Sequence, residues 1–136
     1  MPLFGNKRSR SLLPPDSERH LAIYGEHDYG TGPVPGVETT NWIVAVIELE
    51  RQGLGEQAVS ELHRIALGAR GWALYGASSA INAFFPSQAD TPIARELRDE
   101  RLKFLHDERP PNLRSHLETG EVARYQKLYP EEFPDR

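Results

Sequence analysis

The sequence predicts an all-α fold, a small helical bundle of about four main helices plus short terminal helices. Apolar residues recur at helical spacing in four consecutive segments, and glycines and prolines separate these segments. No series of strands with alternating apolar and polar residues occurs along the 136 residues. A chain of this length can enclose one hydrophobic core without a disulfide or a metal ion. We therefore predict a flexible tail over residues 1–15 and a single helical domain over residues 16–136.

The composition narrows the function classes as well as the fold. Hydrophobic residues make up 38% of the chain and charged residues 26%, which are proportions typical of a folded domain. The longest apolar run, from Trp42 to Ile47, has six residues and is too short for a membrane span. Cysteine is absent, so neither a disulfide framework nor a thiolate zinc site is expected. These features predict a soluble, cytoplasmic protein, and the excess of arginine over lysine is typical of GC-rich bacterial genes.

A short helix and an irregular loop are the first predicted elements. Asp16 can cap a helix that runs to about Tyr24, and Gly25 is expected to end it. The following segment, 26–37, reads EHDYGTGPVPGV and contains three glycines and two prolines. This composition is typical of an irregular connection, so regular structure is expected to resume only after it.

The segment 40–52 can be interpreted as a strand or as a helix. It is rich enough in β-branched residues for a buried strand. At helical spacing, however, its apolar side chains share one broad face and its polar side chains lie opposite. The apolar set comprises Trp42, Ile43, Val46, Ile47 and Leu49. A strand would leave the charged end of the segment unexplained, so the pattern favours a helix that ends at Gly53.

Two further helices are predicted over residues 54–69 and 72–85. In the first, apolar residues form one stripe, and the charged residues lie mostly outside it. The second carries almost no charge and is therefore expected to be the central, most buried helix. Small residues form a ridge along it, which would let a neighbouring helix approach closely. The ridge comprises Ala73, Gly76, Ala77 and Ala80.

A fourth long helix is predicted to begin at Pro92. Thr91 before it is a specific start signal, because threonine caps a helix and proline fits the first helical position. The helix is expected to run to about Asp107. Between Arg95 and Arg109 lie five acidic and five basic residues, which are expected to form a solvated face.

The C-terminal region is expected to form one short helix at about residues 120–128. Ser115 and Glu118 have the spacing of a capping box, in which each side chain accepts a hydrogen bond from the other residue's backbone. The pair would mark the start of a helical segment.

No motif in the sequence identifies a cofactor, a metal ion or a reaction. Nucleotide-binding and phosphate-binding glycine loops are absent, as are an EF-hand loop and a histidine pair at metal-binding spacing. Ser78 lies in a segment, GASSA, that differs by one residue from the nucleophile elbow of hydrolases. The elbow needs a strand before its serine, and here a helix is predicted instead. No cofactor, metal site or catalytic residue is therefore predicted.

The favoured function is protein–protein interaction, with the loop at residues 25–37 and the start of the next helix as the working surface. The candidate partner-binding residues are Tyr24, His27, Tyr29 and Trp42. Aromatic side chains provide a large contact area for little loss of conformational entropy, and the loop prolines limit that loss further. The alternative interpretation is a plain connector whose tyrosines fold back onto the core.

Two other functions are weighed against this one. A small enzyme could use the loop cluster Glu26-His27-Asp28 for acid–base chemistry, although adjacent side chains point in different directions. A nucleic-acid binder could use the basic cluster Lys7, Arg8 and Arg10, but the net charge of −4 argues against a phosphate-binding surface. The sequence names neither a partner nor an oligomeric state, and it permits a homo-oligomer.

Overall fold

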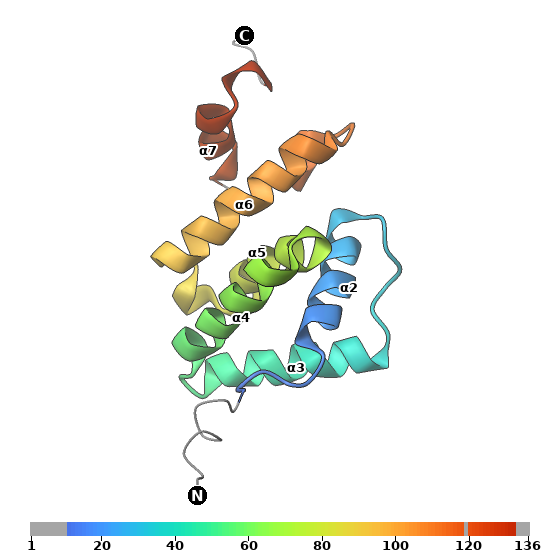
Figure 1. Ribbon diagram of the computed structural model, residues 1–136, viewed down its shortest axis with the longest axis vertical. Helices are drawn as coiled ribbons and strands as arrows, with labels where there is room; N and C mark the ends of the chain where they lie inside the picture. Colours follow the sequence, from blue (N-terminus) through green and yellow to red (C-terminus); the bar gives the residue numbers. More distant parts are fainter. Residues whose placement is uncertain (1–10, 119, 133–136) are drawn as a thin grey trace, which may run out of the picture.

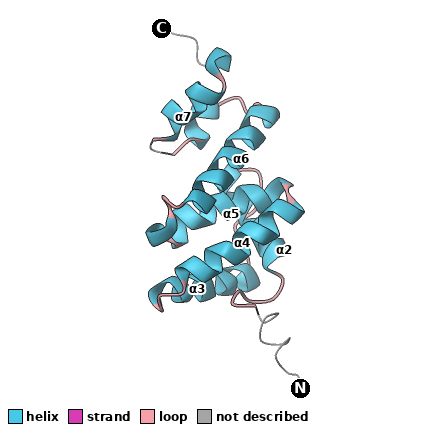
Figure 2. Cartoon of the chain, turned by 60° about the vertical axis from the view of Figure 1, so that its left-hand side comes forward, coloured by secondary structure: helices cyan, strands magenta, loops and turns pink. Residues whose placement is uncertain are grey.

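The computed structural model describes residues 11–118 and 120–132, and all regular structure in these residues is helical (Figures 1 and 2). Six α-helices occur there: α2 (Ser17–Tyr29), α3 (Val37–Arg51), α4 (Gly55–Ala69), α5 (Gly71–Phe84), α6 (Pro92–Glu108) and α7 (Glu121–Leu128). Three short 3-10 helices accompany them: η1 (Pro86–Gln88), η2 (Leu113–His116) and η3 (Pro130–Glu132). The predicted all-α class is therefore confirmed. None of the helices in the described ranges is both long and apolar enough to cross a membrane.

The central helix is α5, which contacts α2, α4 and α6 (Figure 1). All residues from Ala73 to Ile81 are buried, which confirms the prediction that this helix lies in the interior. A helix without charged side chains can be enclosed in this way, because no ionised group has to leave water. The helices α3 and α7 lie at opposite ends of the molecule, with the core between them (Figure 1).

Two glycines bring the backbones of α2 and α5 into contact. A Cβ atom added at Gly76 would overlap the carbonyl oxygen of Leu21, and one added at Gly25 would overlap the carbonyl oxygen of Trp72. The predicted ridge of small residues on α5 therefore does meet a neighbouring helix. The prediction that Gly25 ends the first helix is wrong, because this contact holds the residue inside α2. The helix ends instead at Gly30, whose backbone adopts a left-handed conformation with φ of 102°.

The other helix boundaries agree with the predictions to within one residue, except at the start of α3. The helix predicted from residue 40 begins at Val37, so the irregular loop is confined to residues 30–36. Thr91 caps α6 as predicted, with its Oγ1 accepting a hydrogen bond from the backbone N–H of Ala94. Asp16 precedes α2, but its side chain makes no capping hydrogen bond.

The predicted capping box before α7 is wrong. The Ser115 hydroxyl donates to the carbonyl oxygen of Asn112, 2.7 Å away, because the 3-10 turn η2 occupies this stretch. The backbone N–H of Glu118 donates to the Oε1 atom of Glu121 over 2.9 Å. The carboxylate that accepts from the backbone before α7 is therefore that of Glu121, which belongs to α7 itself.

The charged residues of α6 are not all on a solvated face. Arg101 is 1% exposed, which corrects the prediction for this residue, because α7 covers it with Glu121. The remaining pairs on the helix include Lys103–Asp107, which is exposed as predicted.

Part of the predicted N-terminal tail lies against the domain. Leu13 is buried in the same apolar cluster as α2, α3, α4 and α5. The backbone N–H of Leu12 donates to the Glu61 carboxylate over 2.9 Å. Residues 1–10, with the basic cluster, lie outside the described residues, and the division into a tail and one domain stays a prediction.

Candidate protein-interaction surface

The large hydrophobic side chains that are exposed in the described residues gather in one region. Five such side chains occur, and four of them lie between residues 34 and 47. Their exposed fractions are 78% for Val34, 77% for Val37, 60% for Val44 and 44% for Ile47. Single exposed hydrophobic residues are normal on a protein surface, whereas a local concentration marks a contact site.

Three of these side chains form a strip along the outer face of α3. Val37, Val44 and Ile47 are separated by seven and three residues, a spacing that places them on one side of a helix. The opposite side of α3 faces the core through Trp42 and Val46. The outer side of α3 therefore mixes these three apolar side chains with the exposed polar residues Thr40, Asn41 and Arg51. Ile47 was predicted to share the core-facing side with Trp42 and Val46, and its 44% exposure corrects that prediction. The three exposed apolar side chains are called the α3 strip below.

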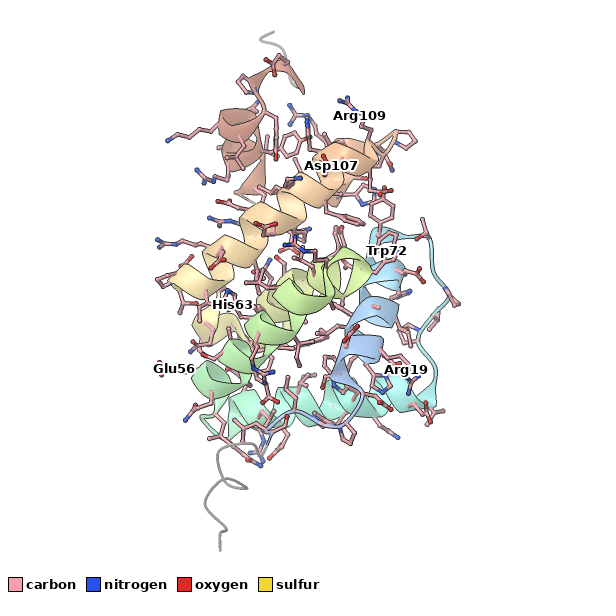
Figure 3. All side chains as sticks on the ribbon, viewed as in Figure 1. Arg19, Glu56, His63, Trp72, Asp107 and Arg109 are labelled. Atoms are coloured by element: carbon pink, nitrogen blue, oxygen red, sulfur yellow. The ribbon has the colours of Figure 1, made fainter. Side chains whose placement is uncertain are left out.

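A groove of about 440 Å³ adjoins the α3 strip. It lies between α2 and the loop at residues 30–36, and its walls include Ile23, Glu26, the loop residues 33–36 and Val37. Val37 belongs to both the groove and the strip, so the two form one continuous surface. Arg19, labelled in Figure 3, makes an exposed ion pair with Glu38 over 3.2 Å at the edge of the groove.

Buried hydrogen bonds fix this surface to the rest of the protein. The Nδ1 atom of His20 lies 2.8 Å from the Oγ1 atom of Thr39, which joins α2 to the first turn of α3. The indole N–H of Trp42 donates to the Ser17 hydroxyl over 2.8 Å. Burial, followed by the nearby Arg19, lowers the pKa of His20. These two contacts are made by neutral groups, and they add to the exposed ion pair between Arg19 and Glu38, which also joins α2 to α3.

The four predicted partner-binding residues do not lie together. Trp42 is 2% exposed and stacks beside His20, on the inner side of α3. Tyr24 is half-buried with its ring 5.3 Å from that of Phe84, and burial raises its pKa to about 12. His27 is half-buried on α2.

Tyr29 lies in a cluster of aromatic rings at the C-terminal end of α2. Its ring centre is 4.5 Å from that of His116 and 5.0 Å from that of Trp72, the residue labelled at the start of α5 in Figure 3. Both predicted tyrosines thus contact the protein's own interior, as the connector interpretation expects. Their role in partner binding stays a prediction.

The cluster proposed for acid–base chemistry is not brought together. Glu26, His27 and Asp28 are consecutive residues of α2, so their side chains diverge around the helix. Glu26 lines the groove, while Asp28 accepts a hydrogen bond from the Ser79 hydroxyl over 3.0 Å. Within residues 11–118 and 120–132, no group of three histidine, aspartate or glutamate side chains is placed to hold a metal ion.

Val34 and Val37 lie in and beside the segment that the sequence suggests as a working surface, but the sequence reasoning did not name the residues that expose apolar surface there. The two valines carry no aromatic or polar signature. A helical projection anchored on Trp42 and Val46 as buried residues would have placed Val44 on the opposite face. No family model matches the chain, and no curated protein or solved structure shows significant similarity to it.

Proposed function

We propose that this protein is a protein-interaction module that binds its partner through the α3 strip and the adjoining groove. The observation that carries the proposal is the concentration of exposed apolar side chains at Val34, Val37, Val44 and Ile47. Such a concentration exposes apolar surface to water at a cost in free energy. A partner that covers the surface would recover this free energy.

The geometry of the strip favours a helix of another protein as the binding partner. From Val37 to Ile47 the strip follows ten residues of α3, which corresponds to about 15 Å along the axis. An amphipathic helix laid along α3 could place its apolar residues between those of the strip. The groove beside Val37 would accept a further apolar side chain from the partner.

The proposal can be tested with a photo-reactive amino acid placed at position 44 in the native cell. We expect it to cross-link one defined partner protein, and we expect Ile47→Asp to abolish that product. The matched control is the same probe at Gln126, an exposed position on α7. If both positions capture the same proteins, or if Val44 captures only a second copy of this chain, the proposal is wrong.

Purified partner then allows the two candidate surfaces to be compared. Val44→Asp should weaken binding at least tenfold while changing the free energy of unfolding by less than about 0.5 kcal/mol. The double substitution His27→Ala and Tyr29→Ala tests the surface predicted from the aromatic residues. If only the double variant loses binding, the partner binds at the C-terminal end of α2 and not at the α3 strip.

A further inference from the structure

Polar contacts hold α7 and the segment that precedes it against α5 and α6. The guanidinium of Arg101 on α6 pairs with the Glu121 carboxylate on α7, and the two side chains are 1% and 3% exposed. Arg101 also donates from Nη1 to the backbone carbonyl of His116 over 3.3 Å, and its guanidinium lies 5.3 Å from the centre of the Tyr75 ring. The amide of Asn82 on α5 donates to the Glu118 carboxylate over 3.0 Å.

The buried pair is less completely bonded than a half-exposed pair nearby. Arg124 and Asp99 join α7 to α6 through two parallel hydrogen bonds, of 3.0 Å and 2.6 Å. Arg101 and Glu121 make only one, and both the Nε atom of Arg101 and the Oε2 atom of Glu121 are buried without a hydrogen-bond partner among the described residues. Buried polar atoms without partners destabilise the state that buries them. Docking of α7 therefore carries a cost that its release would remove.

The helix α7 also has little stability of its own. It spans eight residues, and helices this short do not persist in water without tertiary contacts. Its apolar attachment is centred on Tyr125, which is buried beside Leu102 and Leu105 of α6, and Leu128 and Tyr129 pack at the edge of the same cluster. Release would therefore expose Tyr125, separate Tyr129 from the His106 ring on which it stacks at 3.9 Å, and hydrate the ion pair.

We propose that α7 is a releasable latch that covers a docking site for an acidic segment of a partner protein. The covered surface offers a cationic guanidinium at Arg101 and an amide donor at Asn82. The residues that bind there are the buried Glu121 and the exposed Glu118, two carboxylates three residues apart, followed four residues after Glu121 by the buried ring of Tyr125. A partner segment with the same order, two acidic residues and then an aromatic residue, would make the same contacts.

The occupant is deduced from charge complementarity. Guanidinium groups bind carboxylates preferentially, and a second parallel hydrogen bond, which Glu121 does not form, strengthens the pair. An incoming carboxylate that engages both Nε and Nη2 of Arg101 would bind better than the residue it replaces. The site is distinct from the α3 strip, which lies at the other end of the molecule (Figure 1).

Hydrogen exchange on the unaltered full chain tests the latch. We expect backbone amides of α7 to exchange at least about tenfold faster than those of α5, because α7 opens without unfolding the core. Equal exchange rates in α7 and α5 would show that both unfold together and would overturn the proposal. This measurement needs no variant, so it holds even if substitutions at the buried pair prevent folding.

A fluorescent peptide with the sequence of residues 117–129 tests the docking site. We expect Glu121→Gln in the full chain to strengthen peptide binding by about tenfold, because the internal competitor is weakened. Asp107→Asn, which alters the exposed pair with Lys103, is the matched control and should leave binding unchanged. The peptide with both glutamates replaced by glutamine should not bind. Fast exchange of α7 without peptide binding to the Glu121→Gln chain would overturn the docking site.

Discussion

The contact between α2 and α5 and the contact between α7 and α6 are made by different kinds of interaction. In the first, Gly25 and Gly76 bring two backbones together, and apolar side chains from α3 and α4 enclose them. In the second, a buried ion pair and a half-exposed ion pair connect two helices, with Tyr125 as the main buried ring. The first interface depends mainly on close packing of backbone and apolar side chains, with a hydrogen bond from the Ser79 hydroxyl to the Asp28 carboxylate beside it, whereas the second depends on ion pairs.

This difference predicts which changes will weaken each contact. A close backbone contact depends on shape, so it tolerates changes of pH and salt but not an added atom. An ion pair depends on the charge state of both partners and on how well their remaining hydrogen-bonding atoms are satisfied. We therefore expect the core to respond most to substitutions of small residues, and the α7 contact to respond most to changes of charge.

The largest expected effect is that of Gly76→Ala. The added Cβ would overlap the carbonyl oxygen of Leu21, so α2 and α5 would have to separate, at a cost of about 3 kcal/mol in the free energy of unfolding. Gly68→Ala in α4 is the matched control, because a Cβ there would meet nothing within 4 Å. Denaturant unfolding should show a large loss for the first variant and no loss for the second. Equal midpoints would show that the backbone contact is not tight.

The second effect is that of Glu121→Gln, with an expected loss of about 2 kcal/mol. The variant leaves Arg101 buried without a counter-charge, but release of α7 lets water solvate that guanidinium and limits the loss. Unfolding followed by circular dichroism measures it. A loss greater than that of Gly76→Ala would mean that α7 cannot open separately, and the contrast between the two contacts would then disappear.

The third effect appears at alkaline pH, where one tyrosine reports on each contact. Burial raises the pKa of Tyr24 and of Tyr75 to about 12, from an ordinary value of 10.0. A raised pKa means that the folded state favours the protonated phenol, so the contribution is present below pH 10 and is lost as the pH rises through about 12. By pH 11 the loss should be about 1.4 kcal/mol for each tyrosine.

The tyrosine prediction is checked by following tyrosinate absorbance and thermal unfolding together. Tyr24→Phe should remove one late-titrating phenol and leave the titration of Tyr75 unchanged. The Arg101 guanidinium lowers the pKa of Tyr75 against the larger effect of burial, so Arg101→Met should delay its titration further. Titration of all tyrosines near their ordinary pKa would contradict the burial of both rings.

The smallest effect is expected at acidic pH and involves one histidine near each end of the molecule. Burial lowers the pKa of His20, beside Thr39, and of His116, beside Tyr29. A lowered pKa means that folding favours the neutral imidazole, so stability is complete above the ordinary pKa of 6.5 and declines as the pH falls through the lowered values. Nuclear magnetic resonance of the imidazole protons reports both titrations.

The control for the histidine prediction uses two neighbouring threonines of α3. Thr39→Val removes the hydroxyl that bonds to His20 and should change the titration of that imidazole only. Thr40→Val alters an exposed side chain and should change neither histidine. Imidazoles that titrate at or above their ordinary pKa would show that both rings are solvated.

Local signals in the sequence were sufficient for the helical class and for most helix positions. Helical spacing of apolar residues, the absence of charge in α5, and the Thr91–Pro92 start signal depend only on neighbouring residues, and the structure agrees with each of them. The ambiguous segment that contains Trp42 is helical for the same reason. These properties follow from backbone geometry and side-chain periodicity, which act over a few residues along the chain.

The tertiary structure decided which glycine ends a helix, which charge is buried and which apolar face is left exposed. Gly25 continues α2 because Gly76, more than fifty residues away in sequence, packs against it. Arg101 is buried, although it lies among the exposed charges of α6, because Glu121 covers it. Val44 is exposed because nothing in the described residues covers the outer side of α3. A helix with apolar residues on two sides, or with a charged residue on a mixed face, can be buried on either side as far as its local sequence is concerned. Only the position of the distant helices, which pack where the most apolar surface is buried, selects between them.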